Sequence, residues 1–431
     1  QSSCVACGEC VQACPTGALM PKSHMGAQKV DREVDSVCPF CGVGCLVTFK
    51  VKDEKIVSVE GRAGPANEGR LCVKGRFGMD YVHSPDRLTK PLIRKPGVAK
   101  DVSLLDGHTD WREVFREASW EEALDLAAKP LRDLKEKFGR KALAGFGSAK
   151  GSNEEAYLFQ KLVRTGFGSN NVDHCTRLCH ASSVSALLEG VGSGAVSNPV
   201  RDVEHSDLII VIGSNPTNNH PVAATWMKNA ARRGTRIVLM DPRVTDIGRH
   251  AWRVLPFKAD TDVALLNAML HVIVSEGLCD EAFLRERADH VAELKAHVKD
   301  YTPEAMAPIC GIPAETIREV ARAYATSKAS MILWGMGVSQ HVHGTDNARA
   351  LIALAMITGQ IGRIQGAGPG ALDDDHLAGE RLEVIAEMPG EAVARQVAAA
   401  ILDIMVTREP CLADLAVRAG KNVIRFPGKG D

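Results

Sequence analysis

Residues 38–45 read CPFCGVGC, and the stretch GRLCVKGRFG at 69–78 adds one more cysteine. The resulting spacing, C-x2-C-x3-C-x26-C, is formed by Cys38, Cys41, Cys45 and Cys72. Pro39, Gly42 and Gly44 favour a tight loop whose backbone N–H groups turn toward a bound [4Fe–4S] cluster. A zinc ribbon is the alternative, but the three-residue gap is unusual for zinc. The stretch therefore predicts a small iron–sulfur domain.

A second group of cysteines lies upstream. Its spacing is C-x2-C-x2-C-x3-C before Pro15, formed by Cys4, Cys7, Cys10 and Cys14. Bacterial ferredoxins use this run for [4Fe–4S] clusters, and in two-cluster ferredoxins the last cysteine serves the other cluster. We expect the ligands that complete both sets to lie upstream of Gln1, and zinc is again the alternative. Two clusters in series indicate electron transfer to or from a remote partner.

The composition is that of a large globular chain. Among 431 residues, 45% are apolar and 24% charged, and the net charge of -1 argues against a nucleic-acid-binding arm or a membrane-surface patch. The longest apolar stretches, near 208–212 and 265–274, fall short of the ~18 residues of a membrane span. Of 13 cysteines, 8 lie in the first 72 residues, which indicates metal binding in a reducing compartment rather than a disulfide framework. Ferredoxin-type clusters on the same chain suggest a cytoplasmic complex that feeds a partner.

The middle of the chain predicts a β-α-β unit. DLIIVIGSN at 207–215 and TRIVLMDPR at 235–243 are typical of buried parallel strands, with a helix at 221–234 between them. Ligands of open α/β sheets bind at the carboxyl ends of strands. The polar residues at these two ends are Asn215, Asn218, Asp241 and Arg243. No G-x-G-x-x-G motif is present, so a standard NAD site is not indicated, and an ordinary sheet with polar loops is the alternative.

An earlier stretch, 142–165, predicts strand, loop and helix. The loop GSAKGSN precedes the helix, and Ser152 or Asn153 is positioned to cap it. Such a loop offers free N–H groups to a phosphate, which makes Asn153 a candidate cofactor contact.

NVDHCTRLCHASSV at 171–184 places His174, Cys175, Cys179 and His180 within seven residues. Zinc binding and inert buried cysteines are the alternatives. The adjacent pair Cys179–His180 is the informative feature. A thiolate suits a soft metal–sulfur centre, and an imidazole beside it can take up a proton near neutral pH.

Further along, MILWGMG at 331–337 predicts a strand and TDNARALIALAMITG at 345–359 a helix that carries Arg349. His341 and His343 precede that helix. A solvated helix face is the ordinary location of an arginine. The stretch KADTD at 258–262 opens another helix, and helix capping explains its residues as well as ligand contact does.

CPFCGVGC, GRLCVKGRFG and RLTKPLIRK (87–95) together resemble the start of a molybdopterin oxidoreductase large subunit. The Cys179–His180 pair is similar to that of molybdenum and tungsten formate dehydrogenases, where a cysteine or selenocysteine followed by histidine ligates the metal. In periplasmic nitrate reductases the ligand cysteine lacks the histidine. The resemblance covers about residues 4–362. The family's Asn- and Gln-rich cofactor loop is not found after Gly362, which leaves a split subunit, a discontinuous sequence or a truncated paralogue open.

The resemblance implies a molybdenum or tungsten ion held by two pterin guanine dinucleotides, with Cys179 as its protein ligand. It implies that Arg349 orients formate, since a guanidinium binds a carboxylate through two parallel hydrogen bonds. It places His180 beside the reacting C–H bond and Lys74 between cluster and pterin. Asp262 matches the nucleotide-contacting T-D motif.

We therefore expect an α/β multidomain chain with a ferredoxin-like [4Fe–4S] module, a small cluster domain and doubly wound α/β domains of the molybdopterin oxidoreductase type. The expected domains are 1–30 for the module, 31–90 for the cluster domain, 91–174 and 175–351 for the α/β cofactor-binding domains, 352–370 for a return to the first of these, and 371–431 for an unassigned helical segment.

The expected reaction is formate oxidation to CO2, with electrons passing through the clusters to a flavin and NAD-reducing module, a ferredoxin or a hydrogenase. No nucleic acid and no membrane span are expected. The alternative is a non-catalytic electron-conducting subunit related to the large iron–sulfur subunit of respiratory complex I. The Cys179–His180 pair and Arg349 argue against it, and the same Cys–His pair disfavours an assimilatory nitrate reductase.

Overall fold

The structure, a computed structural model, describes residues 4–20, 29–101, 103, 110–148, 151–194, 198–361 and 424–425. The expected helical segment at 371–431 lies outside the described residues, apart from 424–425. The chain divides into two compact units, Gln1–Phe77 with Cys175–Asp431, and Gly78–His174. In the described part of the chain, no helix combines the length and apolar character needed to span a bilayer.

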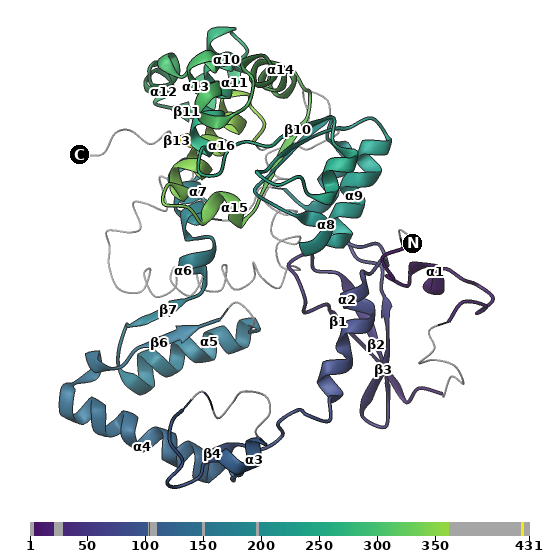
Figure 1. Ribbon diagram of the computed structural model, residues 1–431, viewed down its shortest axis with the longest axis vertical. Helices are drawn as coiled ribbons and strands as arrows, with labels where there is room; N and C mark the ends of the chain where they lie inside the picture. Colours follow the sequence, from purple (N-terminus) through teal and green to yellow (C-terminus); the bar gives the residue numbers. More distant parts are fainter. Residues whose placement is uncertain are drawn as a thin grey trace. The chain divides into compact units, whose positions relative to one another are not determined.

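The first unit begins with a three-stranded antiparallel sheet of β1 (Arg32–Val37), β2 (Leu46–Lys52) and β3 (Lys55–Gly61) (Figure 1). The β1–β2 register pairs Val37 with Leu46, so the cysteine-rich loop 38–45 closes the hairpin. Cys38 N donates a hydrogen bond to Cys45 O at 2.9 Å and extends the ladder by one step. Two short helices accompany the sheet, α1 (Glu9–Gln12) and α2 (Val73–Phe77).

The larger sheet of this unit is entirely parallel, with strand order β10-β9-β8-β12. Its strands are β8 (Leu208–Ile212), β9 (Arg236–Met240), β10 (Arg253–Leu255) and β12 (Ser330–Trp334). Every residue of β8 is buried, as expected for a strand that is covered on both faces. The strands predicted at 207–215 and 331–337 are therefore present, in shorter form.

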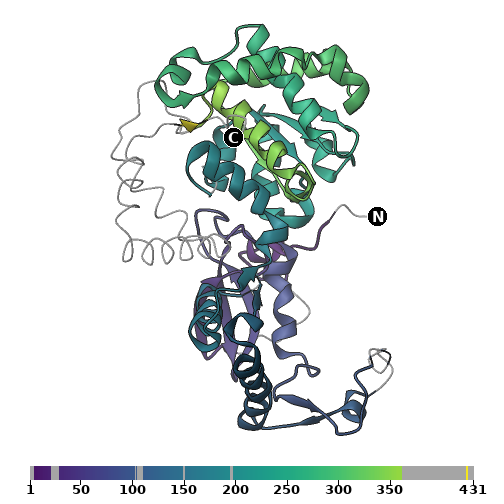
Figure 2. The ribbon, with the colours of Figure 1, turned by 90° about the vertical axis from the view of Figure 1, so that its left-hand side faces the viewer.

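Helices cover both faces of this sheet. Leu208, Ile210 and Ile212 face a core built with helices such as α10 and α16. Ile209 and Val211 face the opposite core, built around Trp226 and Met227 of α9. Figure 2 shows α16, in light green, lying against the sheet. The doubly wound architecture predicted from the sequence is therefore confirmed.

The helices of this part are α6 (Thr176–Cys179), α7 (Ala181–Val191), α8 (Pro216–Asn219), α9 (Pro221–Arg232), α10 (Asp262–Ser275), α11 (Glu281–Arg287), α12 (Val291–His297), α13 (Pro303–Cys310), α14 (Ala314–Ala325), α15 (Met336–Ser339) and α16 (Gly344–Ile357). A two-stranded parallel ladder joins β11 (Ala288–Asp289) to β13 (Ile424–Arg425). The helices predicted at 221–234 and 345–359 correspond to α9 and α16.

The second unit contains two small ladders and two longer helices. Its elements are β4 (Leu92–Arg94), α3 (Trp111–Val114), β5 (Phe115–Glu117), α4 (Trp120–Phe138), β6 (Gly145–Gly147), α5 (Asn153–Lys161), a π-helical turn (Leu162–Phe167) and β7 (Val172–His174). β4 and β5 pair antiparallel, whereas β6 and β7 pair parallel. Ser152 is the residue that caps α5, in a capping box with Glu155.

The parallel sheet has a reversal of strand order at β8. The chain runs outward from β8 to β9 and β10 on one side and returns to β12 on the other. Ligands of open α/β sheets bind in the crevice outside such a switch point. Here the loops after β8 and β12 touch, because Gly337 N donates to Gly213 O at 3.0 Å. A Cβ atom on Gly213 would lie 2.7 Å from the Gly337 carbonyl carbon.

Candidate functional site

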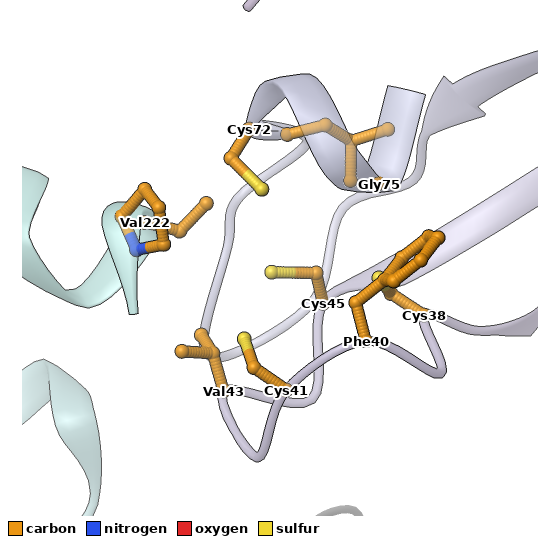
Figure 3. A pocket seen from close by; sticks show the side chains of 10 residues that line it. Cys38, Phe40, Cys41, Val43, Cys45, Cys72, Gly75 and Val222 are labelled. Carbon is orange, nitrogen blue, oxygen red and sulfur yellow. The ribbon is translucent and has the colours of Figure 1, made fainter. Parts of the chain in front are cut away.

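The four cysteines of the small domain line one cavity (Figure 3). Cys38, Cys41 and Cys45 come from the hairpin loop, and Cys72 lies directly before α2. The rest of the lining is apolar or glycine, namely Phe40, Val43, Leu71, Gly75, Pro221 and Val222. A set of thiols in an apolar surround fits an iron–sulfur cluster.

A buried asparagine holds the segment that leads to Cys72 against the hairpin. Asn67 is fully buried, and its Nδ2 donates to the carbonyl oxygens of Leu46, Arg62 and Arg70 at 3.0–3.2 Å. Its Oδ1 accepts from Leu46 N at 3.1 Å. The long x26 gap in the cysteine spacing therefore spans the two strands β2 and β3 and a loop that is pinned back to the hairpin.

Burial raises the pKa of both Cys38 and Cys45. Without metal these thiols therefore stay protonated near neutral pH, and a bound cluster is what stabilises them as thiolates. Gly75 lies against this side of the cavity, where a Cβ atom would be in van der Waals contact with Cys38 Sγ at 3.4 Å.

The upstream cysteines surround α1. Cys4 and Cys10 are exposed, whereas Cys7 and Cys14 are partly buried. A hydrogen bond with the Thr16 hydroxyl lowers the pKa of Cys14 to about 7, which favours the ligating thiolate form. The assignment of Cys14 to a second cluster remains a prediction.

Cys179 ends α6 and lies at the switch point of the sheet. Its Sγ is 3.2 Å from Sδ of Met336 in α15, the short helix that follows β12. Gln340 Nε2 also donates to Leu178 O at 2.9 Å, so two contacts hold this loop to the cysteine segment. The fold thus brings the predicted metal ligand to the edge where α/β sheets bind ligands.

A set of basic side chains, Lys74, His220 and His180, which we call the basic row, lies near both Cys179 and the cluster cavity. Lys74 Nζ donates to Asn218 O at 3.3 Å. Burial lowers the pKa of His220, and its electrostatic interactions with Lys74 and, when that ring is protonated, with His180 lower it further. Desolvation also lowers the pKa of His180, although its ring stays partly exposed. Pro221, next to His220, lines the cluster cavity.

His220 is absent from the sequence prediction. The signal that could have found it is its position. It follows Asn215 and Asn218 in the loop after a buried strand, and it directly precedes the helix α9.

Arg349 lies on α16 and is held by two carboxylates. Its Nε donates to Glu189 Oε2 at 2.9 Å, and its Nη1 donates to Asp346 Oδ1 at 2.9 Å. Among the described residues, none of its hydrogen bonds reaches Cys179 or His180. His341 bonds Asp260 Oδ1 at 3.1 Å and Gly337 O at 2.6 Å, whereas His343 is exposed.

Asp262 is the clearest candidate for a nucleotide contact. It is 1% exposed, and within the described structure its Oδ1 has no hydrogen-bond partner. Burial raises the pKa of this carboxyl group. Side-chain capping of α10 is not observed, because the Thr261 hydroxyl donates to Lys258 O instead. A buried oxygen without a partner fits a ligand that offers N–H donors.

The other candidate cofactor residues lie at strand ends or in the second unit. Asn215 follows β8, and its Oδ1 accepts from the Thr217 hydroxyl at 2.8 Å. Asp241 follows β9, and its Oδ1 accepts from Arg243 N at 2.8 Å. Asn153 begins α5 in the second unit.

Three family models match the chain. The 4Fe-4S binding domain matches residues 1–20, the molybdopterin oxidoreductase Fe4S4 domain matches 31–84, and the molybdopterin oxidoreductase model matches 87–429. These descriptions confirm the predicted cofactor classes, a molybdopterin centre and iron–sulfur clusters, while the number of clusters stays a prediction.

Formate dehydrogenase H of Escherichia coli is 40% identical over 337 residues, which cover 77% of this chain and 45% of that protein. The F420-dependent formate dehydrogenase subunit alpha of Methanocaldococcus jannaschii is 39% identical over 336 residues, covering 78% and 47%. The chain spans about half the length of these curated relatives.

Among solved structures, acetylene hydratase from Pelobacter acetylenicus matches with a TM-score of 0.66 at 24% identity, covering 77% of this chain and 44% of that one. This likeness supports the fold alone. The family models, with the relatives in agreement, show that the chain belongs to the molybdopterin oxidoreductase family.

Proposed function

We propose that the chain is all or part of the catalytic subunit of a molybdenum- or tungsten-dependent formate dehydrogenase. The reaction is HCOO⁻ → CO2 + H⁺ + 2e⁻, and it is reversible in principle. The observation that carries the proposal is the position of Cys179–His180 at the switch point of the sheet, joined to a cysteine-lined cavity by the basic row. The names of the two relatives support formate as the substrate.

A molybdenum or tungsten ion held by two pterin guanine dinucleotides supplies the two-electron acceptor when it is bound. Cys179 ligates this ion through Sγ. His180 has a lowered pKa and is therefore neutral near pH 7, so a ring nitrogen is available to accept the proton that leaves formate. Arg349 orients the formate carboxylate, which requires its guanidinium to share or exchange the contacts with Glu189 and Asp346.

Asp262, with its partnerless oxygen, accepts N–H groups of a guanine base. Asn215, Asp241 and Arg243, at the ends of β8 and β9, contact the nucleotide portion of the cofactor, and Asn153 offers the start of α5 to a phosphate.

Cys38, Cys41, Cys45 and Cys72, and the upstream cysteines, would hold [4Fe–4S] clusters, and such clusters would supply one-electron transfer away from the site. Lys74 places a positive charge beside Cys72, which favours the reduced state of the nearby cluster. The electrons leave to a partner that carries a flavin and NAD-reducing module, a ferredoxin or a hydrogenase, in the cytoplasm. The domain boundaries expected from the sequence, from 1–30 for the ferredoxin-like module to 371–431 for the last segment, are part of this proposal.

Elemental analysis combined with reduction by formate tests the proposal. The anaerobically purified protein, with its co-purifying subunits, should contain about one Mo or W per chain and iron in multiples of four. Added formate should reduce the clusters, as seen by electron paramagnetic resonance (EPR). Cys179→Ala should lose this response, while dithionite still reduces its clusters. Iron without Mo or W, or full formate oxidation by Cys179→Ala, contradicts the proposal. Iron alone would favour an electron-conducting subunit.

A further inference from the structure

Arg76 is a buried cation that contacts both cysteine segments. Its side chain is 5% exposed. Its Nε donates to the carbonyl oxygen of Cys7 at 2.8 Å, and its own backbone N donates to the carbonyl oxygen of Cys72 at 3.1 Å. One residue therefore joins the upstream cysteine loop to the segment that carries the last cysteine of the second set.

Two side chains of α1 accept the remaining hydrogen bonds of the Arg76 guanidinium. Nη2 donates to Glu9 Oε1 at 2.6 Å, and Nη1 donates to Gln12 Oε1 at 2.7 Å. Both residues occupy spacer positions of the C-x2-C-x2-C-x3-C run. Because the side chains of these two spacers are not cluster ligands, they are available for another role.

Glu9 and Gln12 also bind the backbone of the small cluster domain. Glu9 Oε1 accepts from Leu71 N at 2.8 Å, one residue before Cys72. Gln12 accepts from Gly61 N at 3.1 Å and donates to Gly61 O and Gly69 O at 3.0 and 3.2 Å. These bonds fix α1 at the end of β3 and at the loop that leads to Cys72.

The packing at this contact is close. Gly8, with φ of 76°, lies against the Arg76 side chain, because a Cβ atom there would be 2.4 Å from Arg76 Cδ. A buried guanidinium that loses its partners is an uncompensated charge in a poorly solvated site. The contact therefore selects one arrangement of the two cysteine segments rather than a loose association.

We propose that Arg76, Glu9 and Gln12 form a docking network that holds the two clusters at a fixed separation for electron transfer. One electron leaves the reduced cluster of Cys38, Cys41, Cys45 and Cys72, and the oxidised cluster at the upstream loop gains it. Arg76 acts here as a positioning residue. This proposal rests on the proposed function only in that both cysteine sets bind clusters, and it is independent of the substrate.

The test compares Arg76→Met and Gln12→Ala with a matched control, Arg32→Met. Arg32 pairs with Glu54 in the same sheet domain but on an exposed surface. Each protein is purified anaerobically and reduced with dithionite, so the measurement does not require formate turnover. Iron content is measured together with the magnetic interaction between the reduced clusters by EPR. Hydrogen exchange is measured at the amides of residues 4–14.

With iron retained, Arg76→Met and Gln12→Ala should weaken the spin–spin splitting and accelerate exchange at residues 4–14 by roughly tenfold or more. Arg32→Met should match the parent protein. Unchanged splitting and unchanged exchange in both test variants overturn the proposal. If Arg76→Met loses iron, Gln12→Ala decides the outcome alone, because it leaves the arginine in place. A different result in the parent protein would be that formate fails to reduce the clusters although the dithionite-reduced clusters still interact magnetically. That result would reject the proposed function and leave the docking network standing.

Discussion

The Sγ atom of Cys179 lies 3.2 Å from the Sδ atom of Met336, although 157 residues separate them in the chain. Met336 is flanked by Gly335 and Gly337, which pack on Gly213 at the end of β8. The predicted metal ligand is thus fastened to the loops where the strand order of the sheet reverses. The position of Cys179 is consistent with its predicted role as a metal ligand, because open α/β sheets bind ligands at this switch point.

The reactivity of Cys179 in metal-free protein should depend on pH in a specific way. Burial raises its pKa, so the thiolate fraction at pH 8 is smaller than for an ordinary cysteine. The alkylation rate should rise about tenfold per pH unit until the raised pKa is reached. Met336→Ala should expose the thiol and speed alkylation, whereas Met20→Ala should not. Peptide mass spectrometry after iodoacetamide treatment measures the rate, and equal rates in both variants would disprove the shielding.

Lys74→Met should make the reduction potential of the neighbouring cluster more negative. Removing a positive charge next to Cys72 disfavours the state that has gained an electron, and the expected shift is on the order of tens of millivolts. A redox titration followed by EPR gives the potential. Lys55→Met is the control, because Lys55 lies at the opposite end of the β2–β3 hairpin from the cysteine loop. An identical shift in both variants would mean that the effect is not local.

Arg349→Lys should raise the KM for formate about tenfold or more, because an ammonium group keeps the charge but loses the two-pronged contact. The matched control is Arg322→Lys. Arg322 lies on α14 and donates two hydrogen bonds to the Glu276 carboxylate, and replacing Arg322 should leave the KM for formate unchanged. Steady-state kinetics with an artificial electron acceptor provide both constants. A KM in Arg349→Lys equal to that of the parent protein would remove Arg349 from the substrate site.

Local sequence patterns predicted much of the fold, because the burial and backbone conformation of a strand or helix depend mainly on residues that are close in the sequence. The β8 strand is recognisable because a run of apolar β-branched and Leu residues fits only a strand that is buried on both sides. Its predicted end at 215 is too late by three residues. The chain leaves the sheet at Gly213, whose φ of 58° is needed for the contact with Gly337. That contact depends on a strand more than a hundred residues away.

Long-range contacts of the candidate site were outside the reach of sequence patterns. Cysteine spacing predicts a cluster, but it does not say that Arg76 reaches the carbonyl oxygen of Cys7. An arginine on a helix looks the same whether it faces solvent or Glu189. The position of His220 after Asn215 and Asn218 was a signal in the sequence, but its closeness to Lys74 and His180 follows only from the fold.

Asp262→Asn should stabilise metal-free protein at neutral pH. Burial raises the pKa of the folded carboxyl group, so the folded state holds its proton more tightly than the unfolded chain does. The parent protein therefore loses stability as pH rises from the ordinary Asp pKa of ~3.9 through the raised value. The free energy of unfolding of the variant should exceed that of the parent protein by an amount that grows over this pH interval and vanishes below it. Urea denaturation at several pH values measures the difference, and a pH-independent difference would contradict the raised pKa.

Gly213→Ala should cost about 2–4 kcal/mol of folding free energy, because the new Cβ meets two separate penalties. The backbone at φ of 58° disfavours a side chain, and the Cβ would lie 2.7 Å from backbone atoms of Gly337 and Val338. Gly277→Ala separates the two effects, since Gly277 has φ of 70° but a Cβ atom there would meet nothing within 4 Å. That control should cost only about 1 kcal/mol. Chemical denaturation gives both values. Equal costs would show that the contact between Gly213 and the segment after β12 yields easily, and this contact would then not fix the position of Met336 against Cys179.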